Sequence, residues 1–128
     1  MKRIAWIAAV LTSITSNCMA MAANDGGNLF KHCDLAIGAM NDKDPKDRNE
    51  AYQVGLCLGV VEGVVGTMVL EEDANPKSHK ICPPAGGIRN DQATQIVMNF
   101  LFDHPEKTNE SQVSIIHQAI KRAYPCKK

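Results

Sequence analysis

The stretch from Cys82 to Cys126 constrains the fold more than any other part of this sequence. It holds two apolar stripes with the i, i+3, i+4, i+7 spacing of a helix face, separated by a break at His104-Pro105. The stripes are Ala93, Ile96, Val97, Phe100 and Leu101, and then Val113, Ile116, Ile120 and Ala123. Two helices joined by a short turn lie antiparallel, which brings the two cysteines together. A disulfide there should stabilise the fold by about 4 kcal/mol, because it closes a long loop.

The N-terminus has the pattern of a secretory signal peptide. Lys2 and Arg3 precede an apolar run, and Ala20 and Ala22 supply the small residues that cleavage requires, so we expect residues 1–22 to be removed. A lipoprotein acylated at Cys18 is the weaker alternative, because the residues before this cysteine form a poor lipobox. The remaining domain, residues 23–128, is expected in the periplasm. With 12 basic and 14 acidic side chains, it lacks the excess of positive charge that is typical of nucleic-acid-binding proteins.

Four cysteines remain after this cleavage, namely Cys33, Cys57, Cys82 and Cys126. An even number in an oxidising compartment predicts two disulfides. The midpoint between positions 33 and 57 falls in the polar, proline-containing turn 41–47, so the hairpin argument applies again. It favours Cys33–Cys57 with Cys82–Cys126. A nested pairing, Cys57–Cys82 with Cys33–Cys126, stays open.

The first half of the domain predicts two further helices. A short helix over 29–40 should follow a loose lead-in at 24–28, and a second should run from about Asn49 to Leu70. Residues 54–70 are almost wholly apolar, so we expect this helix to be buried on most sides. Its length and the central Glu62 argue against a membrane anchor. The prediction is an all-α bundle of about four helices, with Asn90 as the N-cap of the third.

Two features of the second helix allow more than one interpretation. Gly55, Gly59 and Gly63 fall four apart and so line one face, at a cost in helix propensity of roughly 1 kcal/mol each. Either a neighbouring helix approaches them closely in the core, or they form a glycine-lined subunit contact. Glu62 is either exposed at an edge or paired with a cation or a backbone amide.

The polar residues suggest no catalytic or metal chemistry. His32-Cys33 and His79-x-x-Cys82 are half-motifs for a soft metal, but export should oxidise their cysteines. His104 lies beside a turn proline and His117 beside the apolar stripe, positions at which histidine is common without a catalytic or metal-binding role. No nucleophile elbow, zinc motif or phosphate loop is present. The sequence therefore predicts a protein that is not an enzyme and needs no cofactor.

Several short motifs resemble one known family. They are Cys57-Leu-Gly59, Gly63, Cys82-Pro-Pro84, Gln92, Leu101, His104-Pro105 and Tyr124-Pro-Cys126. In this order and spacing they are similar to the type VI secretion amidase immunity proteins, the Tai/Rap group of small periplasmic antitoxins. The family's usual Tyr-Ile is Val60-Val61 here. The resemblance implies a non-catalytic inhibitor that binds a peptidoglycan-cleaving amidase effector and blocks its active site, often as a homodimer.

An inhibitor of a cleft enzyme needs a protruding polar segment on a rigid scaffold, and the chain offers two. The turn with Asp103, His104, Glu106 and Lys107 is held by two helices, whereas the segment from Glu71 to His79 is longer and more acidic. We favour the turn, because rigidity reduces the entropy lost on binding. The alternative function is a periplasmic acid-stress chaperone that resembles the HdeA type.

Overall fold

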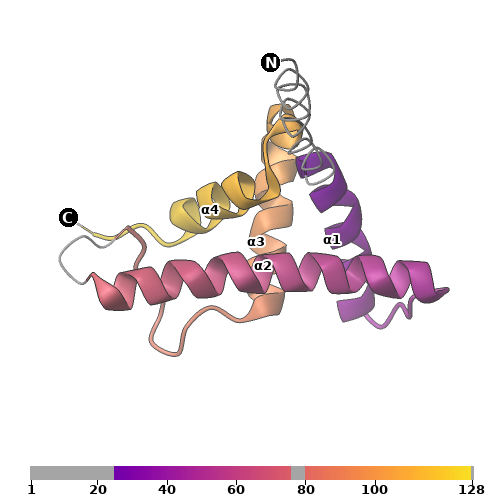
Figure 1. The fold of residues 1–128 in the computed structure, drawn as a ribbon, viewed down its shortest axis with the longest axis horizontal. Helices are drawn as coiled ribbons and strands as arrows, with labels where there is room; N and C mark the ends of the chain where they lie inside the picture. Colours follow the sequence, from indigo (N-terminus) through magenta and orange to yellow (C-terminus); the bar gives the residue numbers. More distant parts are fainter. Residues whose placement is uncertain (1–24, 76–79, 128) are drawn as a thin grey trace, which may run out of the picture.

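The protein is a bundle of α-helices around one small core. The computed structural model describes residues 25–75 and 80–127. These form α1 (Gly26–Met40), α2 (Arg48–Ala74), α3 (Asn90–Asp103), a 3-10 helix η1 (Pro105–Asn109) and α4 (Gln112–Ala123). The long α2 lies across the other α-helices and contacts α1, α3 and α4 (Figure 1). The prediction of an all-α fold is confirmed, and the described residues add only an isolated bridge between Asp25 and Ser111.

Side-chain caps fix where three of the helices begin. Asp25, Asp47 and Ser111 each accept a hydrogen bond from the backbone N–H three residues later, which satisfies one orphan donor of the first turn. The capped start at Asp25 shows that the expected loose lead-in over 24–28 is wrong from Asp25 onward. The third helix begins differently from our expectation, because Asn90 is its first residue and Arg89 occupies the N-cap without a side-chain bond. The Asn90 side chain donates instead to the carbonyl of Leu58 on α2, 3.2 Å away.

The two disulfides have the pairing that the hairpin argument favoured. Cys33 of α1 is bonded to Cys57 of α2, and Cys82 is bonded to Cys126, with Cα–Cα distances of 5.1 and 4.9 Å. The Cys82 N–H also donates to the Tyr124 carbonyl, so the two ends of the α3–α4 hairpin lie side by side. The nested pairing is thereby excluded. Residues 1–22, with the expected signal peptide and Cys18, lie outside the described residues.

The expectation that α2 is buried on most sides is wrong. Its inner face carries Cys57, Val61, Val65, Met68 and Glu72, and the opposite face is open. A Cβ built on any of its glycines would meet nothing within 4 Å, so none of the described helices approaches them. The first interpretation of the glycines fails because α1, α3 and α4 all pack on the other side.

α2 is also longer than the sequence pattern indicated. By length and composition alone its 27 residues could cross a membrane, with a mean hydropathy of 1.8 over a window that is 22% buried. The argument against a membrane helix from length is therefore wrong. The argument from charge stands, because Glu62 is near the middle of the helix and exposed. The disulfide to α1 and the packed inner face are features of a helix that belongs to a bundle.

The core is assembled from one face of each of the four α-helices and from Ile81. Its buried apolar members are Leu29, Cys33, Ala36, Cys57, Val61, Val65, Met68, Ile81, Ala93, Val97, Met98, Leu101, Ile115, Ile116, Ala119 and Ile120. The stripe expected in the third helix is confirmed, with Ala93, Val97 and Leu101 buried and the other two members half-buried. In the fourth helix Val113 and Ala123 are exposed. α4 is rotated from our expectation because Ile115 and Ala119 complete a stripe with Ile116 and Ile120 that the sequence reading overlooked.

The polar connection expected from Glu71 to His79 begins within α2 rather than as a loop. Glu71 to Ala74 continue the helix, and residues 76–79 lie outside the described part of the chain. Glu72 is buried, and its carboxylate accepts hydrogen bonds from the backbone N–H groups of Lys80, at 2.7 and 2.9 Å, and of Ile81, at 3.2 Å. This carboxylate therefore holds the start of the stretch that leads to Cys82.

Candidate functional site

The α3–α4 connection forms a firm tip at one end of the bundle. It is the short helix η1 rather than a simple turn, and the N-terminus of α1 packs against it. The Gly26 N–H donates to the Glu110 carbonyl at 2.9 Å. A Cβ on Gly26 would lie 2.4 Å from Ile115 Cδ1 and 2.9 Å from the Thr108 Cα, so only glycine allows this approach. The tip is thus braced by α1 and α3, which both pack against η1.

The four residues predicted from the sequence lie at this tip, and the structure brings three of them into contacts. His104 Nδ1 is 3.2 Å from Glu106 Oε1, and Lys107 Nζ is 2.6 Å from Glu110 Oε1. Asp103 is exposed at the last position of α3, and no described contact joins it to the other three. The side chain of Glu106 is 64% exposed, whereas that of His104 is 27% exposed and rests on the ring of Phe100.

Glu110 organises the charges behind the tip. Its carboxylate accepts hydrogen bonds from Lys107, from Gln118 at 2.6 Å and from Ser114 at 3.2 Å. The Lys107 bond is the main reason that the pKa of Glu110 lies below its usual value, and it raises the pKa of Lys107 in turn. The positive charge of Lys107 is therefore neutralised locally.

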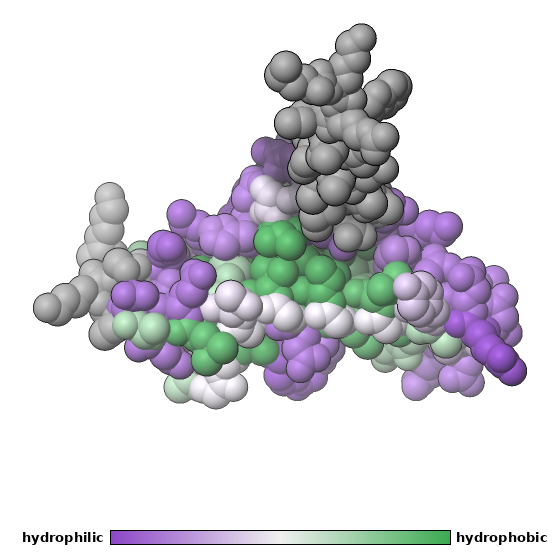
Figure 2. Space-filling view, viewed as in Figure 1, coloured by the Kyte–Doolittle hydropathy of each residue, from purple (hydrophilic) through white to green (hydrophobic). Residues whose placement is uncertain are grey.

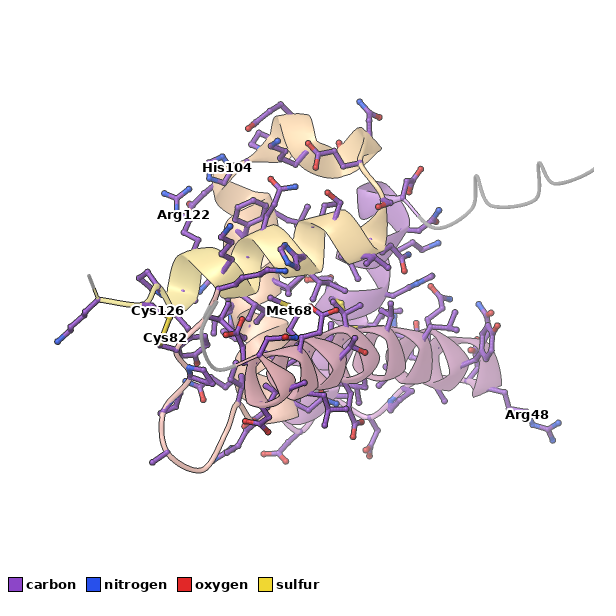
Figure 3. All side chains as sticks on the ribbon, turned by 60° about the vertical axis from the view of Figure 1, so that its left-hand side comes forward. Arg48, Met68, Cys82, His104, Arg122 and Cys126 are labelled. Carbon is purple, nitrogen blue, oxygen red and sulfur yellow. A yellow bond between two sulfur atoms is a disulfide. The ribbon has the colours of Figure 1, made fainter. Side chains whose placement is uncertain are left out.

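His104 is held in one tautomer by its two neighbours. Arg122 Nη1 is 2.6 Å from His104 Nε2, and a guanidinium can only donate. Nε2 must therefore accept, and the proton sits on Nδ1, which donates to Glu106. Figure 3 shows the His104 and Arg122 side chains close together at one edge of the molecule, His104 from the end of α3 and Arg122 from α4.

The sequence reading missed two residues at this end of the molecule. Phe102 is 74% exposed and contacts only the ring of Phe30 among described aromatic side chains, with centroids 5.9 Å apart. Its position off the apolar stripe was the available signal, because a large aromatic residue on a helix's outer face is unusual without a partner. Arg122 had no such signal, since its approach to His104 depends on the fold.

The outward face of α2 is the second candidate surface. Gly55, Gly59, Gly63 and Gly66 run along it, flanked by exposed Tyr52, Leu56 and Leu70. In Figure 2 near-white atoms form a band across the front, along the line of α2, with green apolar atoms beside it. This surface suits a flat apolar partner better than a small ligand.

The remaining sequence candidates do not gather into a site. Cys33 and Cys82 of the two metal half-motifs are both in disulfides, and His79 lies outside the described residues. Burial, with a smaller effect from Lys31, lowers the pKa of His32. His117 is half-buried on α4. Over 25–75 and 80–127 there is no group of three histidine, cysteine or acidic residues that could hold a metal ion.

Comparison with known proteins gives one match. A family model described as Rap1a immunity proteins matches residues 25–126, which covers every described helix and both disulfides. Neither a curated protein nor a solved structure matches the chain.

Proposed function

The chain belongs to the Rap1a immunity protein family, and on this premise we propose that it binds and inhibits a peptidoglycan-cleaving amidase effector of a type VI secretion system. The main support for inhibition by insertion into the catalytic cleft is the braced tip at η1. A protruding segment blocks a catalytic cleft best when it is already ordered, because little conformational entropy is then lost on binding. The brace from α1 supplies that order. The protein acts by occupying the cleft and has no catalytic role of its own.

The tip offers side chains of both charges to an enzyme surface. Asp103 and Glu106 are exposed, and Lys107 and His104 are partly exposed beside them. Exposed Phe102 adds an aromatic anchor of the kind that dominates the energy of protein interfaces. The competing segment from Glu71 is the weaker candidate, because Glu72 is turned inward and occupied by backbone amides.

The test is inhibition of an amidase-like enzyme encoded by an adjacent gene. The purified protein should form a stable complex with that enzyme and suppress its cleavage of peptidoglycan. Alanine at Asp103 and Glu106 together should weaken inhibition, whereas alanine at exposed Asp34 on α1 should not. Full inhibition by the Asp103/Glu106 variant would exclude the tip and make the segment from Glu71 the candidate. Failure to bind any co-encoded peptidoglycan hydrolase would refute the immunity function itself.

We infer further that the protein forms a homodimer through the outward face of α2. This face is about 27 Å long from Tyr52 to Leu70, at 1.5 Å per residue. The residues of this face are also arranged symmetrically on either side of position 61, so that two copies can pack against each other. In an antiparallel pair with a two-fold axis there, Tyr52 faces Leu70 of the second copy, Leu56 faces the notch at Gly66, and Gly59 faces Gly63. Glycines at the axis allow the two backbones to approach closely.

The dimer is tested by placing a charge at its axis. Gly59→Lys should convert a dimer to a monomer in sedimentation velocity, because two ammonium groups would be buried against each other. The fold is not at risk, since lysine has the higher helix propensity and nothing lies within 4 Å of the position. Ala123→Lys, on the exposed end of α4, is the control and should stay dimeric. A monomeric wild type, or a dimeric Gly59→Lys variant, would refute this interface.

The proposed location is the periplasm, where the amidase would meet peptidoglycan. Two disulfides in a domain of this size support an oxidising compartment. The exposed α2 face also favours the second candidate, an HdeA-like acid-stress chaperone, because a chaperone needs apolar surface. Light scattering of an acid-denatured client separates the two. The immunity protein should leave aggregation unchanged, whereas suppression at low pH without binding a hydrolase would favour the chaperone.

A further inference from the structure

A pocket with an excess of positive charge lies between the tip and α4. It has a volume of about 370 Å³ and is lined by Phe100, His104, Lys107, Gln118, Lys121 and Arg122. No carboxylate lines it. The Lys107 ammonium is already paired with Glu110, which leaves Lys121 and Arg122 as the uncompensated cations. Neither of them has a carboxylate partner in the part of the chain that the structure describes.

Arg122 is oriented as a receptor for an anion. Its Nη1 is fixed by the neutral His104 ring, and Glu106 fixes that ring from its other nitrogen. The guanidinium has five N–H donors, and this is its only hydrogen bond to residues 25–75 and 80–127, so its other donors remain available there. A guanidinium held in place by a neutral acceptor keeps its full charge. This differs from Lys107, whose charge is cancelled by its own neighbour.

We propose that this pocket binds a carboxylate side chain of the effector, with Arg122 as the bidentate donor and Lys121 as the second cation. A carboxylate is the planar two-oxygen anion that a guanidinium binds through two parallel hydrogen bonds. Binding it would also relieve the repulsion between the adjacent cations. His104 is a positioning residue that acts through Arg122. This inference rests on the proposed function, because it names what the effector presents to the surface beside the tip.

The experiment measures the dissociation constant of the wild-type complex with the co-encoded amidase and that of three variants. Arg122→Gln should weaken binding by about 10- to 100-fold, the range expected for a charge-assisted pair of hydrogen bonds. Lys121→Gln should weaken it by about 3- to 10-fold and reduce its dependence on salt. Arg48→Gln, which removes the same charge at the distant start of α2 (Figure 3), is the control and should bind like the wild type.

The role of His104 is tested by rescue. His104→Gln keeps an oxygen that can accept from Arg122, whereas His104→Leu does not, so the glutamine variant should bind the amidase more tightly than the leucine variant. Equal binding by the two would refute the positioning role.

The outcomes separate this proposal from the proposed function. If the wild type binds no amidase, the proposed function fails and this proposal fails with it. If the wild type binds and Arg122→Gln binds equally well, the pocket proposal alone is overturned. Free peptidoglycan stem peptides also carry carboxylates. Saturable binding of a soluble peptidoglycan fragment that is lost in Arg122→Gln, without any change in amidase affinity, would overturn the assignment to the effector.

Discussion

Gly26 and Gly27 are adjacent, and the structure gives opposite expectations for the same substitution at each. A Cβ on Gly26 would lie 2.4 Å from the flexible end of Ile115, and also 2.9 Å from the Thr108 Cα and 3.1 Å from the Lys107 carbonyl oxygen. The last two atoms are backbone, so η1 must move. Overpacking of this kind costs about 1–3 kcal/mol. A Cβ on Gly27 meets only a side-chain oxygen of Asp25 at 3.5 Å, which is ordinary contact.

The two variants should therefore differ in stability by a measurable amount. Gly27→Ala should raise the free energy of unfolding by up to about 1 kcal/mol, because alanine has the higher helix propensity. Gly26→Ala should lower it by about 1–3 kcal/mol. Urea denaturation followed by circular dichroism, with both disulfides intact, measures the difference. Equal unfolding midpoints would refute the close packing of the α1 start against η1.

The Gly26→Ala and Gly27→Ala variants also test whether the tip takes part in inhibition. If η1 blocks the amidase cleft as proposed, moving its backbone should weaken inhibition by Gly26→Ala at temperatures where that variant is still fully folded. Gly27→Ala should inhibit like the wild type. A Gly26→Ala protein that is destabilised yet inhibits fully would show that the position of η1 does not control the interface.

Three further outcomes are expected. Leu101→Ala should cost roughly 2–5 kcal/mol in urea denaturation because this residue is 2% exposed, whereas Val113→Ala, at 57% exposed, should change stability by less than about 0.5 kcal/mol; similar costs would mean that the helix faces are wrong. Cys126→Ser should cost about 2–5 kcal/mol, and the intact mass of the exported protein should lack residues 1–22 and four hydrogens; free thiols under denaturing, non-reducing conditions would contradict this. Burial lowers the pKa of His32, so as pH falls the imidazole of the unfolded chain is protonated before that of the folded chain. Stability should therefore decline below about pH 6.5 until the lower folded pKa is passed. His32→Gln should lack this contribution in a pH series of denaturation curves.

Local signals in the sequence were sufficient for the helices and their covalent links. Apolar stripes and a proline break located the α3–α4 hairpin, and the midpoint argument favoured the observed disulfides over the nested pairing, which the structure excludes. The errors arose where tertiary packing decides between faces. Val113 fits a helical stripe as well as Ile115 does, yet Ile115 is buried and Val113 is exposed, a difference that depends on how α4 packs in the bundle.

The environment of the candidate site was less accessible to sequence reasoning. The turn itself was found, because proline and charge mark it. Its helical form and its brace from Gly26 depend on a contact between residues far apart in the chain. Arg122 likewise reaches His104 across eighteen positions, a relation that no local pattern encodes. Glycine spacing on α2 pointed to close approach of another backbone, and the structure shows that this backbone is not within the described chain.

The open face of α2 explains why a domain of this size carries two disulfides. A helix that turns four glycines and three large apolar side chains outward contributes only one face to the core. The Cys33–Cys57 bond joins that helix to α1, and the Cys82–Cys126 bond closes the base of the α3–α4 hairpin. Cross-links of this kind destabilise the unfolded chain without requiring further core surface. The apolar face is then left open for the proposed second copy, while folding becomes dependent on oxidation. In a reducing cytosol the domain would be weakened, so inhibition would be confined to the compartment in which the proposed amidase acts.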